Sequence, residues 1–205
     1  MKVLFTYDRE ADIWCLLNKG KSSSQSPVPT QVYEQLVAAC GEDPTHDATS
    51  AFIDTYLREK GIDVPSHIRT YQQDWDSVAE EFERIASSLF GVSLPHDTKA
   101  YLSINTRCPY NIAENHFFVS MPGLSARKTT MHELWHFYTW YSVGRANAEA
   151  LDPQTYDRYK ESLTVLLNVV CRDVLPAGVS DKGYPQDREL REKILTLWAR
   201  EPDFR

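Results

Sequence analysis

The stretch Thr129-Thr-Met-His-Glu-Leu-Trp-His-Phe-Tyr138 decides how the rest of this sequence can be interpreted. It contains a His-Glu-x-x-His pattern made by His132, Glu133 and His136. On an α-helix, residues four positions apart lie on the same face, so both imidazoles can point at one position. Neutral imidazole is a good zinc ligand, and a glutamate beside the pair can reach a water without binding the metal. The pattern therefore predicts a hydrolytic zinc site in which Glu133 is the general base.

The residues around this pattern favour a long, mostly buried helix over residues 126–143. No Gly or Pro falls in that range, Ser125 can cap the helix start, and Gly144 can end the helix. Its uncharged positions are Met131, Leu134, Trp135, Phe137 and Tyr138. A buried histidine pair needs polar partners or a metal. The alternative interpretation is a pair of hydrogen-bonded core histidines beside a chance glutamate.

Length and composition indicate a folded protein of one domain, residues 1–205. The chain is 42% hydrophobic and 12% aromatic, which is enough for a sizeable core. A net charge of −7 argues against nucleic acid or an anionic membrane as the main partner. No apolar run approaches the length of a membrane span, and the first ten residues are too poor in apolar residues for a signal peptide.

The four cysteines give no sign of a disulfide framework or of a cysteine-rich zinc site. They are far apart and form no Cys-x-x-Cys pair; they are Cys15, Cys40, Cys108 and Cys171. Widely spaced thiols of this kind are typical of a reducing compartment, so we expect a cytoplasmic protein. A catalytic cysteine is a minor alternative, because nothing in the local sequence marks one.

The pattern of apolar residues predicts an α+β fold that is mainly helical, with a small sheet packed on the His-Glu helix. The leading half, residues 1–96, is expected to be mainly helical after a short strand over residues 2–7. Its expected helices cover residues 8–18, 31–40, 48–60 and 76–90. Residues 62–74 between them are expected to be irregular.

The metal core is expected over residues 97–175. Two strands at residues 99–107 and 116–121, separated by a turn region, precede the His-Glu helix. One helix over residues 152–172 follows, started by Asp152 with Pro153 in its first turn. A loop and a last helix are expected within residues 176–205. If the strand just before the His-Glu helix is an exposed edge, it can hold an extended peptide; otherwise the strands only cover the helix.

A catalytic zinc needs three protein ligands and an open position for water. No histidine follows His136, so a downstream third ligand must be a carboxylate or, as a weaker choice, Cys171. We favour Glu161, because an acid within an apolar helix turns inward and then needs a partner such as a metal. Asn168, seven residues later on the same side, can support a ligand.

Other choices for the third ligand stay open from the residues alone. Glu149 is the second candidate and His116 is the third. The alternative for Glu161 is an exposed acid beside Lys160.

At these residues the chain resembles the zincin metallopeptidases, and within them the gluzincins, over roughly residues 100–171. Gluzincins hold zinc with two helix histidines and a glutamate from a later helix. Thermolysin-like members carry Asn before that glutamate and Asp four residues after it, where this chain has Lys160 and Val165. The resemblance implies a zinc metallopeptidase with a peptide or protein substrate and with zinc on His132, His136 and Glu161.

The expected chemistry is hydrolysis of a peptide bond, with Glu133 moving a proton from water to the leaving amine. The oxyanion needs one more donor; the Tyr and Arg candidates are Tyr156, Tyr159, Arg172 and Tyr184. One alternative is a non-catalytic zincin-fold binding or regulatory protein, with a structural zinc closed by a fourth ligand. Another is a helical bundle without metal. Two histidines and a carboxylate also suit non-haem iron, but Glu133 favours zinc hydrolysis. The oligomeric state leaves no signal in the sequence.

Overall fold

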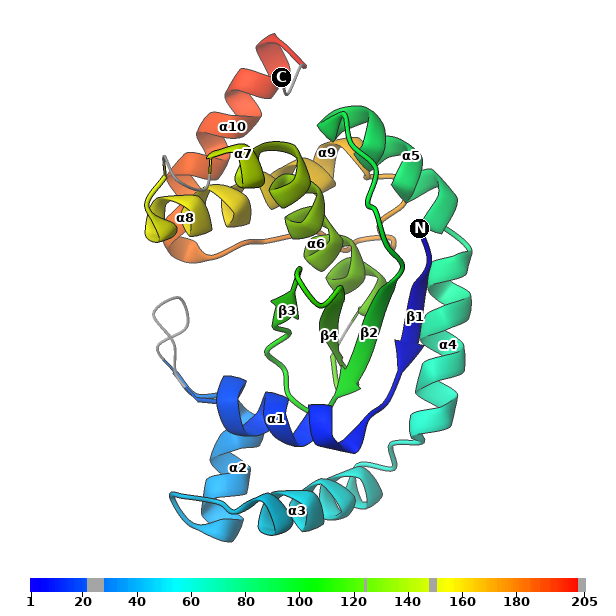
Figure 1. Cartoon of the computed structure of the whole chain (residues 1–205), viewed down its shortest axis with the longest axis vertical. Coiled ribbons are helices and arrows are strands. Elements are labelled where there is room, and N and C mark those ends of the chain that lie inside the picture. Colours follow the sequence, from blue (N-terminus) through cyan, green and yellow to red (C-terminus); the bar gives the residue numbers. More distant parts are fainter. Residues whose placement is uncertain (22–27, 124, 148–150, 203–205) are drawn as a thin grey trace. The chain divides into compact units, whose positions relative to one another are not determined.

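The protein, seen in a computed structural model, contains both helices and strands (Figure 1). Its chain divides into two compact units. The described residues are 1–21, 28–123, 125–147 and 151–202. Unit 1 comprises Met1, Asp76–His96 and Arg127–Arg205, and unit 2 comprises Lys2–Trp75 and Asp97–Ala126. The expected α+β class is confirmed at this level, because helices predominate and the strands form one small mixed sheet. That the whole chain folds as a single domain stays a prediction.

The sheet of unit 2 has four strands in the order β1-β2-β4-β3. Its strands are β1 (Val3–Thr6), β2 (Thr98–Ser103), β3 (Tyr110–Asn111) and β4 (His116–Ser120). The first three in spatial order are parallel, and β3 pairs antiparallel to β4. β4 therefore lies between two strands where β3 covers it, at His116 and Phe117. Of the two alternatives for the strand before the His-Glu helix, the exposed edge is wrong for this part of β4, because residues 110–111 of the expected turn pair with it.

Three helices of unit 2 begin at residues whose side chains cap them. α1 (Arg9–Lys19), α2 (Gln31–Cys40) and α3 (His46–Glu59) follow Asp8, Thr30 and Thr45. Each of these side chains accepts a hydrogen bond from a backbone N–H of the first turn, at 3.0 to 3.3 Å. A capping oxygen satisfies a backbone donor that has no partner within the helix, which fixes where the helix starts.

The stretch expected to be irregular is a helix, α4 (Val64–Asp76). Asp63 accepts from the N–H of Ser66, and a proline in the first turn is compatible with a helix start. The side-chain amide of Gln72 forms hydrogen bonds with the backbone of β1, much as a neighbouring strand would. It accepts from the N–H of Phe5 and donates to the carbonyl of Val3, both at 3.0 Å. Figure 1 shows α4 along β1. Contacts of this kind join residues far apart in the sequence, so the local pattern gave no sign of them.

Unit 1 is helical in its described part. Its elements are α5 (Ala79–Phe90), α6 (Ala126–Thr139), a π-helix (Trp140–Gly144), α7 (Arg145–Asn147), α8 (Pro153–Leu163), a 3-10 turn (Thr164–Leu166), α9 (Leu167–Val170), a second 3-10 turn (Pro185–Asp187) and α10 (Arg188–Arg200). None of the helices in the described part of the chain has the length and apolar character needed to cross a membrane.

Helix α6 is anchored by its aromatic residues, as its uncharged sequence predicted. Trp135 packs edge-on against Phe90, with ring centroids 5.0 Å apart, and Tyr138 stacks on Phe90 at 5.8 Å. The indole N–H of Trp135 also donates to the carbonyl of Leu163 in α8, at 3.1 Å. These buried contacts fix the rotation of α6 and hence the direction of its histidines.

Two helix boundaries differ from the prediction. Gly144 does not end the His-Glu helix, which continues through a π-helical turn into α7. A Cβ at Gly144 would lie 2.4 Å from the hydroxyl oxygen of Tyr156, so this glycine permits close packing. The single helix expected over residues 152–172 starts at Asp152 as predicted, but the 3-10 turn at Thr164–Leu166 divides it.

Candidate metal centre

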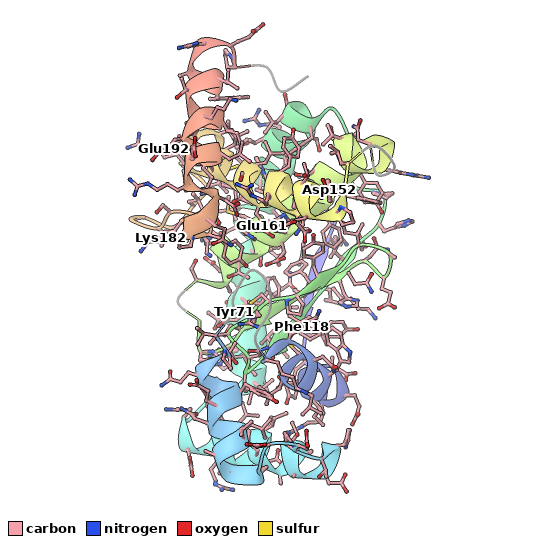
Figure 2. All side chains as sticks on the ribbon, turned by 90° about the vertical axis from the view of Figure 1, so that its left-hand side faces the viewer. Tyr71, Phe118, Asp152, Glu161, Lys182 and Glu192 are labelled. Atoms are coloured by element: carbon pink, nitrogen blue, oxygen red, sulfur yellow. The ribbon has the colours of Figure 1, made fainter. Side chains whose placement is uncertain are left out.

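Three side chains from two helices of unit 1 converge on one position. His132 and His136 lie on consecutive turns of α6, and their Nε2 atoms are 3.0 Å apart. Glu161 comes from α8, where Figure 2 labels it. Its Oε2 lies 3.4 Å from Nε2 of His132, and its Oε1 lies 3.4 Å from Nε2 of His136. The structure thus brings together the three residues that the sequence suggested as metal ligands.

The spacing of these donor atoms suits a small divalent cation. Ligands about 2.0–2.1 Å from a tetrahedral zinc are about 3.3 Å from one another. Here the two Nε2 atoms are 3.0 Å apart, and each lies 3.4 Å from a different oxygen of the Glu161 carboxylate. With one donor atom from each residue, all three atoms lie within 4.8 Å of one another. Within the described residues, Oε2 of Glu161 is buried and lacks a hydrogen-bond partner. A cation would relieve that cost, so the donor set and its environment fit zinc.

A second carboxylate orients His132. Oδ2 of Asp181 lies 2.7 Å from Nδ1 of His132, which places a proton on Nδ1 and turns Nε2 toward the cluster. Oδ1 of Asp181 accepts from the Thr164 hydroxyl at 2.8 Å and from Arg191 at 3.0 Å. A carboxylate bonded to the far nitrogen of a histidine is a common support for metal binding.

Asn168 holds the backbone of Asp181 in place. Its side-chain oxygen accepts from the N–H of Asp181 at 2.7 Å, and its amide donates to the carbonyl of Asp181 at 2.8 Å. The sequence suggested that Asn168 supports a ligand. In the structure Asn168 bonds to Asp181, which in turn orients the ligand candidate His132.

Burial and charge decide the protonation states of the cluster. Burial acts to lower the pKa of His132, but the hydrogen bond to Asp181 and the nearby carboxylate of Glu161 outweigh it and raise this pKa to about 10. Burial lowers the pKa of His136 well below its ordinary value. Burial acts to raise the pKa of Glu161, yet the neighbouring histidines and Lys160 hold it below its ordinary value. His136 is therefore neutral and Glu161 ionised, the forms that bind metal, while His132 must release one proton to do so.

Glu133 is buried beside the cluster, with 5% of its surface exposed. Burial raises its pKa to about 8, and the charge of Glu161 adds to this effect while that of His132 opposes it. The carboxyl group therefore lies within electrostatic reach of two of the three candidate ligands. That Glu133 is the general base of the site stays a prediction of the His-Glu-x-x-His pattern.

Lys160 contributes a buried positive charge to the site. Its Nζ lies 2.9 Å from Oε1 of Glu161 and 3.3 Å from Oδ1 of Asp157. Both Lys160 and Glu161 are buried, at 6% and 5% exposed. The alternative of an exposed acid beside Lys160 is therefore wrong.

Of the remaining ligand candidates, His116 and Cys171 do not belong to the cluster. Glu149 lies outside the described residues. His116 is in unit 2, with its ring against Tyr101 and Phe118 at centroid distances of 5.4 and 5.8 Å. Cys171 is buried, and burial raises the pKa of its thiol to about 12. A protonated, apolar-packed thiol is a poor metal ligand.

The expected oxyanion donors lie in varied surroundings. The hydroxyl of Tyr156 packs against Gly144, and its ring meets Trp140 at a centroid distance of 5.9 Å. Arg172 is exposed, whereas Tyr159 and Tyr184 are partly buried. A cationic group that touches the side chain of a candidate ligand is Lys160, which the sequence did not suggest for this role.

Three residues of the site, Asp181, Arg191 and Lys160, escaped the sequence analysis. Arg191 left a signal that could have been followed: it lies three residues before the apolar Ile194, so the two share one face of a helix. An arginine at such a position is buried only when it has anionic or carbonyl partners. Asp181 left no comparable signal, because it lies in a loop among other acids.

Comparison of the chain with protein family models, with curated proteins and with solved structures finds no match.

Proposed function

We propose that this chain is a zinc-dependent hydrolase of the zincin type, and that it is a metallopeptidase acting on a peptide or protein. The observation that carries the proposal is the convergence of His132, His136 and Glu161 with donor atoms 3.0 to 3.4 Å apart, next to buried Glu133. These are the ligand types of a hydrolytic zinc site together with the carboxylate that such a site needs. The zincin arrangement, with the small sheet packed on the His-Glu helix, is part of this proposal.

Zinc held by these three residues would supply the Lewis acid that activates water and polarises the substrate carbonyl. The chain's own residues do the rest. Burial gives Glu133 a pKa of about 8 in the metal-free chain, and beside the positive charge of a bound cation it would become ionised. As a carboxylate, Glu133 accepts the proton of the attacking water and delivers it to the leaving amine. One C–O bond forms and the C–N bond breaks, so water is divided between the new acid and the new amine. The buried surroundings of Glu133 strengthen its interaction with the charges that develop.

Lys160 supports the same chemistry through its charge. Its ammonium group touches Glu161 and acts electrostatically on Glu133. A buried cation at this place keeps Glu161 ionised in the absence of metal, and adds positive potential where a carbonyl oxygen would gain charge. In this proposal it takes over the part that the sequence assigned to a tyrosine or arginine.

The test begins with metal content and ends with cleavage. Full-length protein is loaded with zinc, dialysed, and measured for metal by mass spectrometry and for activity on a mixed peptide library. We expect one zinc per chain and new peptide ends. Glu133→Gln should keep the zinc and lose cleavage by about 10²- to 10⁴-fold, whereas exposed Glu189→Gln should keep both.

The possible outcomes separate the competing functions. Protein that binds no zinc contradicts the proposal at its first step. Zinc binding with full cleavage by the Glu133→Gln variant contradicts the assigned mechanism. Stoichiometric zinc without cleavage of any library member favours the non-catalytic alternative, in which the zinc has a binding or regulatory role.

We also propose the cytoplasm as the place of action. The support is that Cys15 and Cys171 are buried as thiols, a state that a reducing compartment preserves.

A further inference from the structure

We infer that Arg191 of α10 is a positioning residue for the metal centre, and that metal binding is coupled to the docking of this helix within unit 1. The inference rests on the proposed zinc site. It adds a part of the chain that neither the His-Glu pattern nor the ligand helix includes.

The guanidinium of Arg191 joins the two supports of the candidate ligands. One nitrogen donates to the carbonyl of Glu161 at 3.1 Å and to the hydroxyl of Thr164 at 2.7 Å. The other donates to the carbonyl of Asp181 at 2.7 Å and to its Oδ1 at 3.0 Å. Since Asp181 orients His132, a single side chain holds both the backbone of one ligand and the partner of another.

The loop before α10 is shaped around this guanidinium. Gly183 has a φ of +62°, and a Cβ there would lie 2.5 to 2.8 Å from three atoms of the Arg191 guanidinium group. Both the backbone conformation and the close approach require glycine. The loop therefore packs directly on Arg191, as expected if the loop and the helix dock as one piece.

Burial distinguishes Arg191 from the other arginine in the same turn. Arg191 is 5% exposed, and a buried guanidinium needs the several acceptors that it has here. Arg188 is exposed and pairs with Glu192, which Figure 2 labels on α10, at 3.0 Å. An exposed pair of this type adds little to stability. Arg188 thus serves as a matched control on the same helix.

The coupling follows from the contacts. A cation would hold Nε2 of His132 and the carboxylate of Glu161. Arg191 holds Asp181, which orients His132, and the backbone carbonyl of Glu161. The cation and Arg191 therefore stabilise the same arrangement of the two ligands. By linkage, the factor by which docking of α10 strengthens zinc binding equals the factor by which zinc strengthens docking of α10.

The first measurement is zinc affinity of the full-length chain, by competition with a chromophoric chelator. Arg191→Met should weaken zinc binding by about 10- to 100-fold, the usual effect of removing an outer support of a metal site. Arg191→Lys, which keeps the charge but not the forked donors, should recover part of the loss. Arg188→Met should stay within about twofold of the unmodified chain, because it removes only a surface pair.

The second measurement is amide hydrogen exchange of the unmodified chain with and without zinc, read by mass spectrometry. Zinc should slow exchange in peptides covering Arg188–Arg200 and leave peptides from α3 in unit 2 unchanged. Because this measurement needs no variant, it decides the matter even if Arg191→Met fails to fold.

The results distinguish the two proposals. If zinc binds but exchange in α10 does not change, the coupling is wrong and the proposed zinc site stands. If Arg191→Met folds and binds zinc as tightly as Arg188→Met, Arg191 is not a positioning residue. If the unmodified chain takes up no zinc, the proposed function and this inference fall together.

Discussion

Replacing Asp181 by Asn isolates the contact that orients His132. The carboxylate receives the Nδ1 proton of His132 on one oxygen, and bonds from Thr164 and Arg191 on the other. Asparagine has nearly the same shape but offers one acceptor oxygen and one donor NH2 group. The change therefore removes a single hydrogen-bond acceptor and one charge without opening a cavity.

Neither orientation of the new amide satisfies all its neighbours. If its oxygen faces Arg191 and Thr164, its NH2 faces Nδ1 of His132, and the imidazole must then carry its proton on Nε2. A protonated Nε2 cannot bind metal. If its oxygen faces His132, its NH2 opposes the buried guanidinium of Arg191. We expect zinc affinity to fall by about 100-fold, the upper end for such supports, or about 2.7 kcal/mol.

The assay is chelator competition at neutral pH, with Asp173→Asn as the control. Asp173 is exposed, so its replacement changes net charge by the same amount without touching His132. A loss confined to Asp181→Asn supports the orienting role. Equal zinc affinities in the two variants would show that Asp181 does not fix the tautomer of His132, and the reasoning would fail.

Three further predictions concern stability and packing. Gln72→Ala should lower the free energy of unfolding by about 2–4 kcal/mol in urea titrations, because it leaves two backbone groups of β1 without their hydrogen-bond partner. The control Gln73→Ala, at an exposed position, should change this free energy little. Equal effects of the two variants would refute the contact between Gln72 and β1. Burial raises the pKa of Asp12 to about 6, so the folded state binds more protons than the unfolded state between about pH 4 and 6. The free energy of unfolding should therefore fall by about 3 kcal/mol in total as pH rises through that range. Urea titrations at pH 4 to 7 should show no such slope for Asp12→Asn. A slope that persists in this variant would belong to another group. Gly144→Ala should lower the melting temperature measured by circular dichroism, since the added carbon meets the Tyr156 hydroxyl; an unchanged melting temperature would contradict that packing.

Helix capping and apolar spacing made many elements predictable. Asp152 starts α8 as expected, because its side chain accepts two backbone N–H groups. The uncharged residues around the histidines produce a buried α6. Helix α4 was not predicted, although Asp63 and the proline two residues later are local start signals. Its contact with β1 through Gln72 joins residues nearly seventy positions apart and left no local signal.

Some residues of the candidate site were likewise predictable from local spacing, whereas the places of others depend on tertiary packing. The spacing of His132 and His136 predicted a shared position because the helix repeat itself puts residues four apart on one face. Glu161 was predicted to turn inward from its apolar neighbours, and it is buried. The place of Lys160 depends on how α8 is rotated against α6, and no local periodicity specifies that rotation.

By itself, the sequence determined the pair of imidazoles on one helix, the acid between them and the buried acid on a later helix, because each follows from the geometry of a single element. Only the tertiary structure decided that Asp181 and Arg191 support the cluster. Asp181 meets His132 at a sequence separation of 49 residues, and Arg191 meets the carbonyl of Glu161 at a separation of 30. Contacts at such separations are set by the packing of whole elements, which side-chain spacing along the chain does not encode.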